Sequence, residues 1–262
     1  MRARHCSRIL ASLVCVAIVS GCATQGSIND TTGNLGVEKR NSPAKIYVEM
    51  GIAYMREGQD AVALKKLRKA ISVDGRNPEA HNVIAILYER LGEVERATYH
   101  YDQAARFDPK DPYIRNARGS FFCKLNRYKE ADEEFLKALA NPLYTTPWVA
   151  LGNAGLCAER AGDKTKAEGY YRRSLSANQN YAPVLLQMAQ LSFDQDNPMS
   201  ARAYLERYHG VSAVTAASLW LGVRVEQKLG DRMKAVEYKR RLLREFPDAP
   251  EIQALNQSER AR

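Results

Sequence analysis

The sequence predicts an all-α protein whose helices stack into a right-handed superhelical solenoid. Three observations support this fold class. One residue pattern recurs about every 34 residues, each recurrence holds two stretches with helical periodicity, and a turn residue separates the two stretches. The 262 residues therefore need no division into ordinary globular domains, because each repeat of a solenoid contacts mainly its neighbours.

The clearest repeat runs from Pro78 to Lys110. Counted from Pro78, it has small residues at positions 8, 20 and 27, aromatic residues at 11 and 24, glycine at 15 and proline at 32. In the same order these residues are Ala85, Ala97, Ala104, Tyr88, Tyr101, Gly92 and Pro109. Small residues let two helices approach closely, and proline ends the second helix because it has no N–H to donate. The pattern is that of a tetratricopeptide repeat, a hairpin of two antiparallel helices.

Six tetratricopeptide repeats are predicted over residues 44–249. Their ranges are 44–77, 78–111, 112–147, 148–181, 182–215 and 216–249. The third is 36 residues long because NPLYTTP, residues 141–147, contains two prolines that interrupt a helix, and we expect this insertion to loosen the stacking locally. Repeat 6 is the most degenerate, with Glu226 where an aromatic residue is usual, as expected for an end repeat that faces water. Residues 250–262 are predicted to be a charged cap or a frayed tail.

Residues 1–21 are predicted to be a signal peptide. Three arginines precede an apolar run, Ile9–Val19, that is too short to span a bilayer. The string from Val19 to Cys22, VSGC, resembles a bacterial lipobox, which implies that Cys22 becomes the lipidated first residue of the mature protein. The alternatives are a plain secretory signal cut near Ala23 and a cytosolic apolar stub.

The lipidated cysteine begins a predicted flexible tether, residues 22–43, rich in Gly, Thr, Asn and Ser. Its r.m.s. reach is about 25 Å, from about 5–6 Å times the square root of the number of residues. The residue after Cys22 is Ala23 and not aspartate. By resemblance to the sorting of enterobacterial lipoproteins, the chain then has no signal for retention in the inner membrane, which favours the outer membrane, with the protein facing the periplasm.

The charge balance is mildly basic. The full chain carries 39 Lys and Arg against 30 Asp and Glu, and loss of residues 1–21 removes three arginines and no acids, which leaves an excess of 6. Such an excess suits an anionic surface or an acidic partner. Nucleic acid is the rival partner, but the basic residues are scattered over both helices of each repeat, so we expect none.

The sequence contains no pattern typical of an enzyme. His81 lies at a packing position, His100 neighbours one, and His209 ends a helix, and none has a Cys or Asp at metal-ligand spacing. A glycine-rich phosphate loop, CxxC and HExxH are all missing from the sequence. We therefore expect no catalytic residues, cofactor, metal site or small-molecule substrate.

Two cysteines, Cys123 and Cys157, remain after the predicted signal peptide and lipidation site. They fall on the first helices of repeats 3 and 4, which a solenoid places side by side. A disulfide forms in an oxidising periplasm if the two Cα atoms lie within about 7 Å. We predict this disulfide; the alternative is two buried thiols.

A partner-binding groove is predicted on the first helices, where positions 2, 5, 9, 12 and 13 face the concave side. These residues are Lys45, Val48, Ile52, Met55 and Arg56 in repeat 1, Glu79, Asn82, Ile86, Glu89 and Arg90 in repeat 2, and Tyr113 in repeat 3. An apolar strip flanked by charges suits an amphipathic or extended apolar segment. The alternative is that Ile52 and Ile86 only pack against the neighbouring helix.

Three strings, YVEMGIAYMREGQDAVALKKLRKA, NPLYTTPWVALGNAGLC and AASLWLGVRVEQKLGDRMKA, together with the lipobox and six repeats, resemble the PilF/PilW family of type IV pilus biogenesis lipoproteins. The resemblance covers the whole chain. It implies a pilotin or stabiliser in the outer membrane that helps secretin subunits localise and assemble into the pore for the pilus. The alternative is a generic envelope-assembly adaptor lipoprotein with a partner outside the pilus machine.

Overall fold

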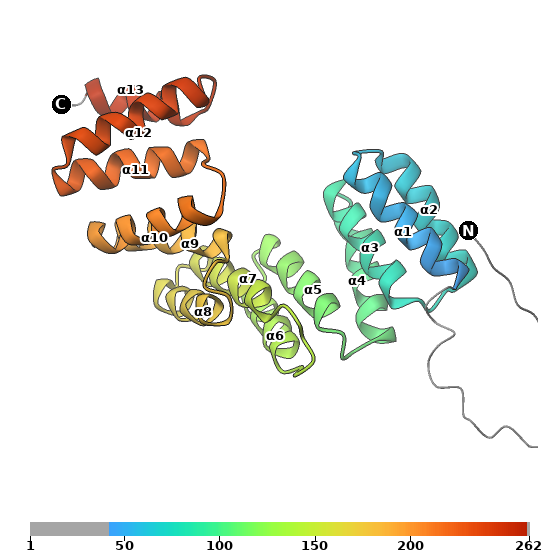
Figure 1. The fold of residues 1–262 in the computed structure, drawn as a ribbon. Helices are drawn as coiled ribbons and strands as arrows, with labels where there is room; N and C mark the ends of the chain where they lie inside the picture. The colour runs from blue at the N-terminus through green and yellow to red at the C-terminus, as the bar shows by residue number, and fades with distance from the viewer. Residues whose placement is uncertain (1–41, 261–262) are drawn as a thin grey trace, which may run out of the picture. The chain divides into compact units, whose positions relative to one another are not determined.

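The computed structural model describes residues 42–260, which form thirteen α-helices and no strand (Figure 1). In order they are α1 Pro43–Arg56, α2 Asp60–Val73, α3 Pro78–Arg90, α4 Val94–Phe107, α5 Pro112–Lys124, α6 Tyr128–Leu139, α7 Pro147–Arg160, α8 Lys164–Ala177, α9 Ala182–Asp194, α10 Pro198–Val211, α11 Ala216–Leu229, α12 Arg232–Glu245 and α13 Glu251–Arg260. The predicted all-α tetratricopeptide fold is confirmed. The predicted signal peptide, Cys22 and almost all of the tether lie outside the described residues, and no helix within 42–260 is long and apolar enough to cross a bilayer.

Small residues at position 8 bring the two helices of a repeat together, as predicted. A Cβ atom on Gly51 would lie 2.6 Å from the Leu67 side chain, and one on Gly119 would lie 2.8 Å from the Phe135 ring. Leu67 and Phe135, both at position 24, are fully buried. Burying side chains of this size contributes roughly 1.5–3 kcal/mol each, so every repeat is stabilised by its own hairpin contact.

The turn between the two helices has a left-handed residue at position 15 in every repeat. The six residues, with φ between 60° and 86°, are Gly58, Gly92, Asn126, Gly162, Asp196 and Gly230. Glycine adopts this conformation without a steric penalty, and asparagine and aspartate tolerate it better than other side chains. The turn geometry is therefore retained where repeats 3 and 5 lack the glycine.

The first helices of repeats 1 to 3 begin in the same way, with a capping residue followed by proline. Ser42, Asn77 and Asp111 each accept a hydrogen bond from a backbone N–H of the first turn through a side-chain oxygen. Proline fits the next position because its missing N–H would have no partner there. These local signals start α1, α3 and α5 at defined residues.

The NPLYTTP insertion interrupts the helices as predicted, between α6 and α7. Our expectation that it loosens the stacking is wrong. Tyr144, inside the insertion, is only 6 % exposed and packs with Ala138 of α6 and Ala150 of α7. The extra residues therefore supply an aromatic side chain that fills the junction between repeats 3 and 4.

The last repeat departs from the others in its packing. Gly222 meets the Tyr238 ring, one residue earlier in each helix than the usual pair at positions 8 and 24. Helix α13 follows and inserts Leu255 into a cluster with Leu219 and Leu242. Within the described residues, the segment after repeat 6 is thus a packed helix rather than a frayed tail.

Candidate partner-binding groove

A groove lies between α1 and α3, the first helices of repeats 1 and 2. Apolar residues of both helices form most of its lining, with one arginine from the last turn of each: Ile52, Met55, Arg56, Val83, Ile86 and Arg90. Its volume is about 630 Å³, which falls within the range of about 300–1,000 Å³ that is typical of binding clefts. Ile86 is 38 % exposed, so the groove offers apolar surface to solvent.

Helical spacing brings these side chains to one surface. Ile52, Met55 and Arg56 are three and four residues apart, and Ile86 and Arg90 repeat the same interval on α3. Residues at these intervals lie on the same helix face. The groove therefore follows directly from two adjacent first helices with matching apolar and basic positions.

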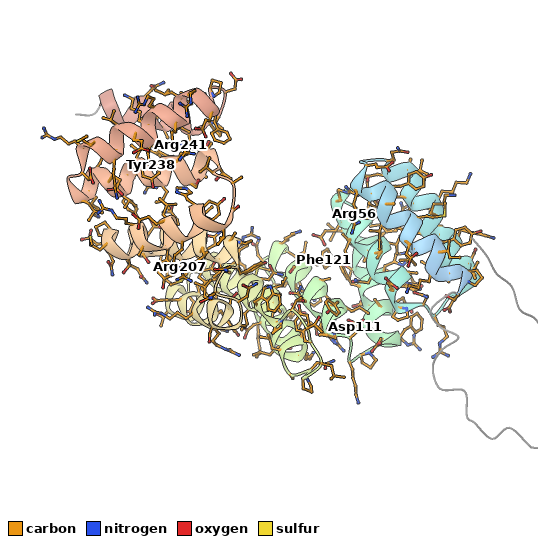
Figure 2. All side chains as sticks on the ribbon, in the orientation of Figure 1. Arg56, Asp111, Phe121, Arg207, Tyr238 and Arg241 are labelled. Carbon is orange, nitrogen blue, oxygen red and sulfur yellow. A yellow bond between two sulfur atoms is a disulfide. The ribbon has the colours of Figure 1, made fainter. Side chains whose placement is uncertain are left out.

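The two arginines differ in what they contact. The Arg90 guanidinium lies 2.8 Å from Asp60 Oδ1 and donates to the carbonyl oxygen of Met55 at 2.9 Å, so contacts to repeat 1 hold it in place. Arg56 is exposed at the end of α1, where Figure 2 labels it, and no acidic group of residues 42–260 pairs with it. One guanidinium is thus available to a bound segment beside the apolar lining.

Several predicted groove residues lie elsewhere. The prediction for Val48 is wrong: its side chain is fully buried in the main apolar core and offers no surface to a bound segment. Asn82 is half-buried and does not line the groove, and neither do Lys45 and Glu79. Val83, at position 6, is a lining residue that the position rule missed.

Glu89 and Tyr113 contact other parts of the chain. Glu89 accepts a hydrogen bond from the Tyr101 hydroxyl at 2.8 Å and pairs with Lys124, so it joins repeats 2 and 3. Tyr113 stacks edge-on against Tyr144, and its hydroxyl lies 2.6 Å from Thr145 Oγ1. Neither side chain lines the groove, because each is held in a junction between repeats.

Comparison with known proteins connects this architecture to a family. A tetratricopeptide repeat family matches residues 48–112. The crystal structure of PilW, a widely conserved type IV pilus biogenesis factor, is 31% identical in sequence and has a TM-score of 0.76, and the match covers 82% of this chain and 99% of that one. The chain belongs to the PilF/PilW family of tetratricopeptide proteins.

Two further comparisons agree. The type IV pilus assembly protein PilF of Pseudomonas aeruginosa is 29% identical over 235 residues, which make up 90% of this chain and 92% of that protein. A solved structure of Pseudomonas aeruginosa PilF has a TM-score of 0.74 at 28% identity, over 82% of this chain and 97% of that one. The resemblance to PilF and PilW seen in the sequence is confirmed.

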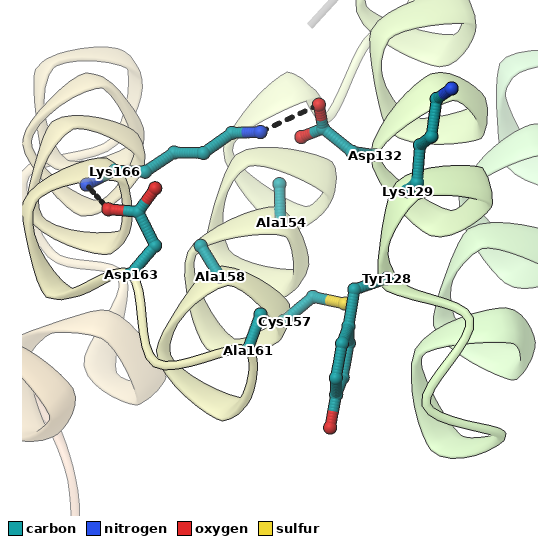
Figure 3. A pocket seen from close by; sticks show the side chains of 9 residues that line it. All are labelled: Tyr128, Lys129, Asp132, Ala154, Cys157, Ala158, Ala161, Asp163 and Lys166. Carbon is teal, nitrogen blue, oxygen red and sulfur yellow. Dashed lines mark hydrogen bonds and ion pairs between the residues drawn. The ribbon is translucent and has the colours of Figure 1, made fainter.

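A smaller hollow in this PilF/PilW family member lies at the junction of repeats 3 and 4 (Figure 3). Alanines of α7 line it, and Lys166 Nζ lies 2.8 Å from Asp132 Oδ2 at its edge, which joins α8 to α6. Its volume of about 240 Å³ is below the range of binding clefts. We therefore do not assign a binding role to this hollow.

The two cysteines of the family member lie side by side at the same junction. Their Cα atoms are 5.7 Å apart and the sulfur atoms are paired, within the Cα range of about 4.4–6.8 Å that disulfides span. Cys123 and Cys157 are each 4 % exposed, so the pair is inside the junction. The predicted proximity is confirmed, and the covalent bond stays a prediction.

The histidines pack against one another. His81 Nδ1 lies 3.0 Å from His100 Nδ1, and His81 Nε2 lies 3.2 Å from the carbonyl oxygen of Gly75. Burial lowers the pKa of both rings, that of His100 to about 4, to which the charge of His81 also contributes. Both rings are therefore neutral near pH 7, and one donates to the other.

Within residues 42–260, no three His, Cys, Asp or Glu side chains lie close enough together to hold a metal ion.

Proposed function

We propose that this protein is an outer-membrane lipoprotein scaffold for type IV pilus biogenesis. It binds a secretin subunit through the groove of repeats 1 and 2 and promotes the localisation and multimerisation of the secretin. The apolar groove between α1 and α3 is the observation that supports this function most directly. The relationship to PilF and PilW supports the pilus setting.

The lining of the groove defines the segment that it fits. Ile52, Met55, Val83 and Ile86 accept apolar side chains, and Arg56 offers a guanidinium to an acidic neighbour. Two or three buried apolar side chains give roughly 3–9 kcal/mol before the costs of ordering the segment and of association. The proposed contact is thus a reversible one that needs help from high local concentration.

A lipid anchor on Cys22 supplies this concentration. The acyl chains hold the protein at the membrane in which the secretin assembles, and the tether of residues 22–43 lets the groove reach its target. Linking two binding events through a flexible tether gives effective concentrations in the millimolar range. In this mechanism the protein gathers secretin protomers and carries out no chemical step.

Substitution of the groove tests the proposal. Ile52→Asp and Ile86→Asp place a carboxylate in the apolar lining, and we expect both to abolish heat-stable secretin multimers and surface pili in a strain that lacks the wild-type gene. Val62→Asp is the matched control, because Val62 is similarly exposed at 36 % but lies on α2 outside the groove. Circular dichroism must show the same helical content in all three variants.

The outcomes separate the parts of the proposal. Unchanged secretin multimers in the folded Ile52→Asp and Ile86→Asp variants would refute the groove. Cys22→Ala should release a soluble periplasmic form, and recovery of that form with outer membranes would refute the anchor. If both groove variants bind wild-type amounts of secretin but lose another envelope protein in crosslinked cells, the generic adaptor function replaces the pilus function.

A further inference from the structure

The last repeat exposes an apolar stripe along α12. Met233, Val236 and Leu243 are 86, 61 and 42 % exposed. Val236 and Leu243 are two helical turns apart on one face, and together with Arg240 they border a shallow hollow of about 470 Å³. End repeats of solenoids usually present polar residues to water. This stripe therefore departs from the polar end that the sequence predicted.

The positions of the stripe explain its origin. Val236, Arg240 and Leu243 stand at positions 21, 25 and 28 of repeat 6. In each of the five earlier repeats, the residue at position 21 or 25 makes a polar contact with the repeat that follows. These contacts are Arg68 to Tyr88 (3.1 Å), Asp102 to Arg118 (2.6 Å), Asp132 to Lys166 (2.8 Å), Glu168 to Gln195 (3.1 Å) and Arg202 to Glu226 (2.9 Å). The stripe thus lies on the face of α12 that corresponds to the stacking face of the earlier second helices.

Helix α13 leaves this surface open. Its Leu255 packs with Leu219 of α11 and with Leu242, at position 27 of α12. Figure 1 shows α13 as the last helix beside α12. Helix α13 begins one residue after position 1 of a seventh repeat and contacts α11, as α3 contacts α1, so it takes the place of a seventh first helix. Val236 and Leu243 are exposed with α13 in place, so α13 does not cover the stripe.

We propose that this face of α12, the terminal face, binds an acidic amphipathic helix of a partner protein. The helix lies along the part of α12 that α13 leaves uncovered, with apolar residues on Val236 and Leu243. Helix α12 carries six basic and two acidic residues. No acidic group in the described part of the chain pairs with Arg240, so a carboxylate of the partner completes the polar contact seen at the other junctions.

A designed peptide tests the terminal face without knowledge of the natural partner. The probe is a labelled helix of about 21 residues, six turns, with leucine at heptad core positions and glutamate beside them. We expect saturable binding by fluorescence anisotropy, weakened at least about tenfold by Val236→Glu and by Arg240→Glu. Arg240 is exposed, so its variant keeps the test valid if Val236→Glu unfolds.

Controls separate the terminal face from the groove and from rival occupants. Val62→Glu should bind the peptide as the wild type does. Ile52→Asp, in the groove, should keep the part of the peptide binding that Arg240→Glu abolishes. A peptide with lysine in place of glutamate should not bind. Equal binding by wild type and Arg240→Glu overturns the proposal. Two other results would also overturn it. If sedimentation shows a dimer that Arg240→Glu dissociates, the occupant is a second copy of the chain. If the protein binds phosphatidylglycerol vesicles but not the peptide, and Val236→Glu abolishes vesicle binding, the occupant is a lipid surface.

Discussion

Replacing Arg202 by methionine should destabilise the C-terminal repeats by about 3–5 kcal/mol, the cost of leaving a buried charge without its partner. Glu226 is only 2 % exposed. Arg202 Nε donates to Glu226 Oε1 at 2.9 Å, and Arg202 Nη2 pairs with the other carboxylate oxygen. This hydrogen bonding also raises the pKa of Arg202. Arg202 Nη2 also lies 3.7 Å from Asp231 Oδ2, so the substitution leaves two neighbouring carboxylates without the guanidinium.

Removing both charges should have a far smaller effect. Replacement of a whole buried ion pair by apolar residues of similar size is often neutral or stabilising, by about 1–4 kcal/mol. Position 11, where Glu226 stands, holds an aromatic residue in repeats 1 to 3, as at Tyr88, and alanine in repeat 4, so the site accepts an apolar side chain. The double variant Arg202→Met/Glu226→Met should therefore lie within about 1 kcal/mol of the wild type.

The assay is a double-mutant cycle with a local probe. Trp220 packs at the edge of the last-repeat cluster, and in a Trp148→Phe background its fluorescence reports urea unfolding of that repeat. A local signal is needed because repeat arrays can unfold in steps. A loss below about 1 kcal/mol for Arg202→Met, or a double variant equal to the sum of the two single losses, would refute the reasoning.

Three further predictions concern the interior. A Cβ atom on Gly155 would collide with the Tyr171 ring, so Gly155→Val should lower the free energy of unfolding by at least the roughly 1–3 kcal/mol typical of overpacking, seen as a lower thermal midpoint. Burial lowers the pKa of His100 to about 4, so as the pH falls the unfolded chain takes up this proton before the folded protein does. The free energy of unfolding should therefore decrease as the pH drops from about 6.5 to 4, by about 1 kcal/mol at pH 5 after allowance for solvent exposure. In thermal scans, His100→Gln should flatten this pH dependence. Alkylation in denaturant without reductant should leave Cys123 and Cys157 unmodified, and replacing both by serine should cost about 3–4 kcal/mol for their 34-residue separation. Full labelling of both cysteines in the unfolded, unreduced chain would contradict the disulfide.

The repeats were predictable because their signals are local. A glycine at position 8 against a large residue at position 24, as in Gly51 and Leu67, lies within one hairpin and recurs at a fixed interval. The same periodicity could not place Val48, which stands at a position assigned to the concave side but is fully buried in the core. It also could not show that Tyr144 fills the junction it interrupts. Contacts between repeats depend on geometry that the pattern alone does not contain.

The groove and the terminal face share one chemistry. Each proposed surface combines apolar side chains with one arginine, Arg56 or Arg240, that has no acidic partner in the described residues. Most other arginines at the junctions are occupied, as Arg118 is by Asp102 and Arg202 by Glu226. On both proposed surfaces an unpaired positive charge therefore stands beside apolar side chains, an arrangement that suits acidic amphipathic segments better than purely apolar ones.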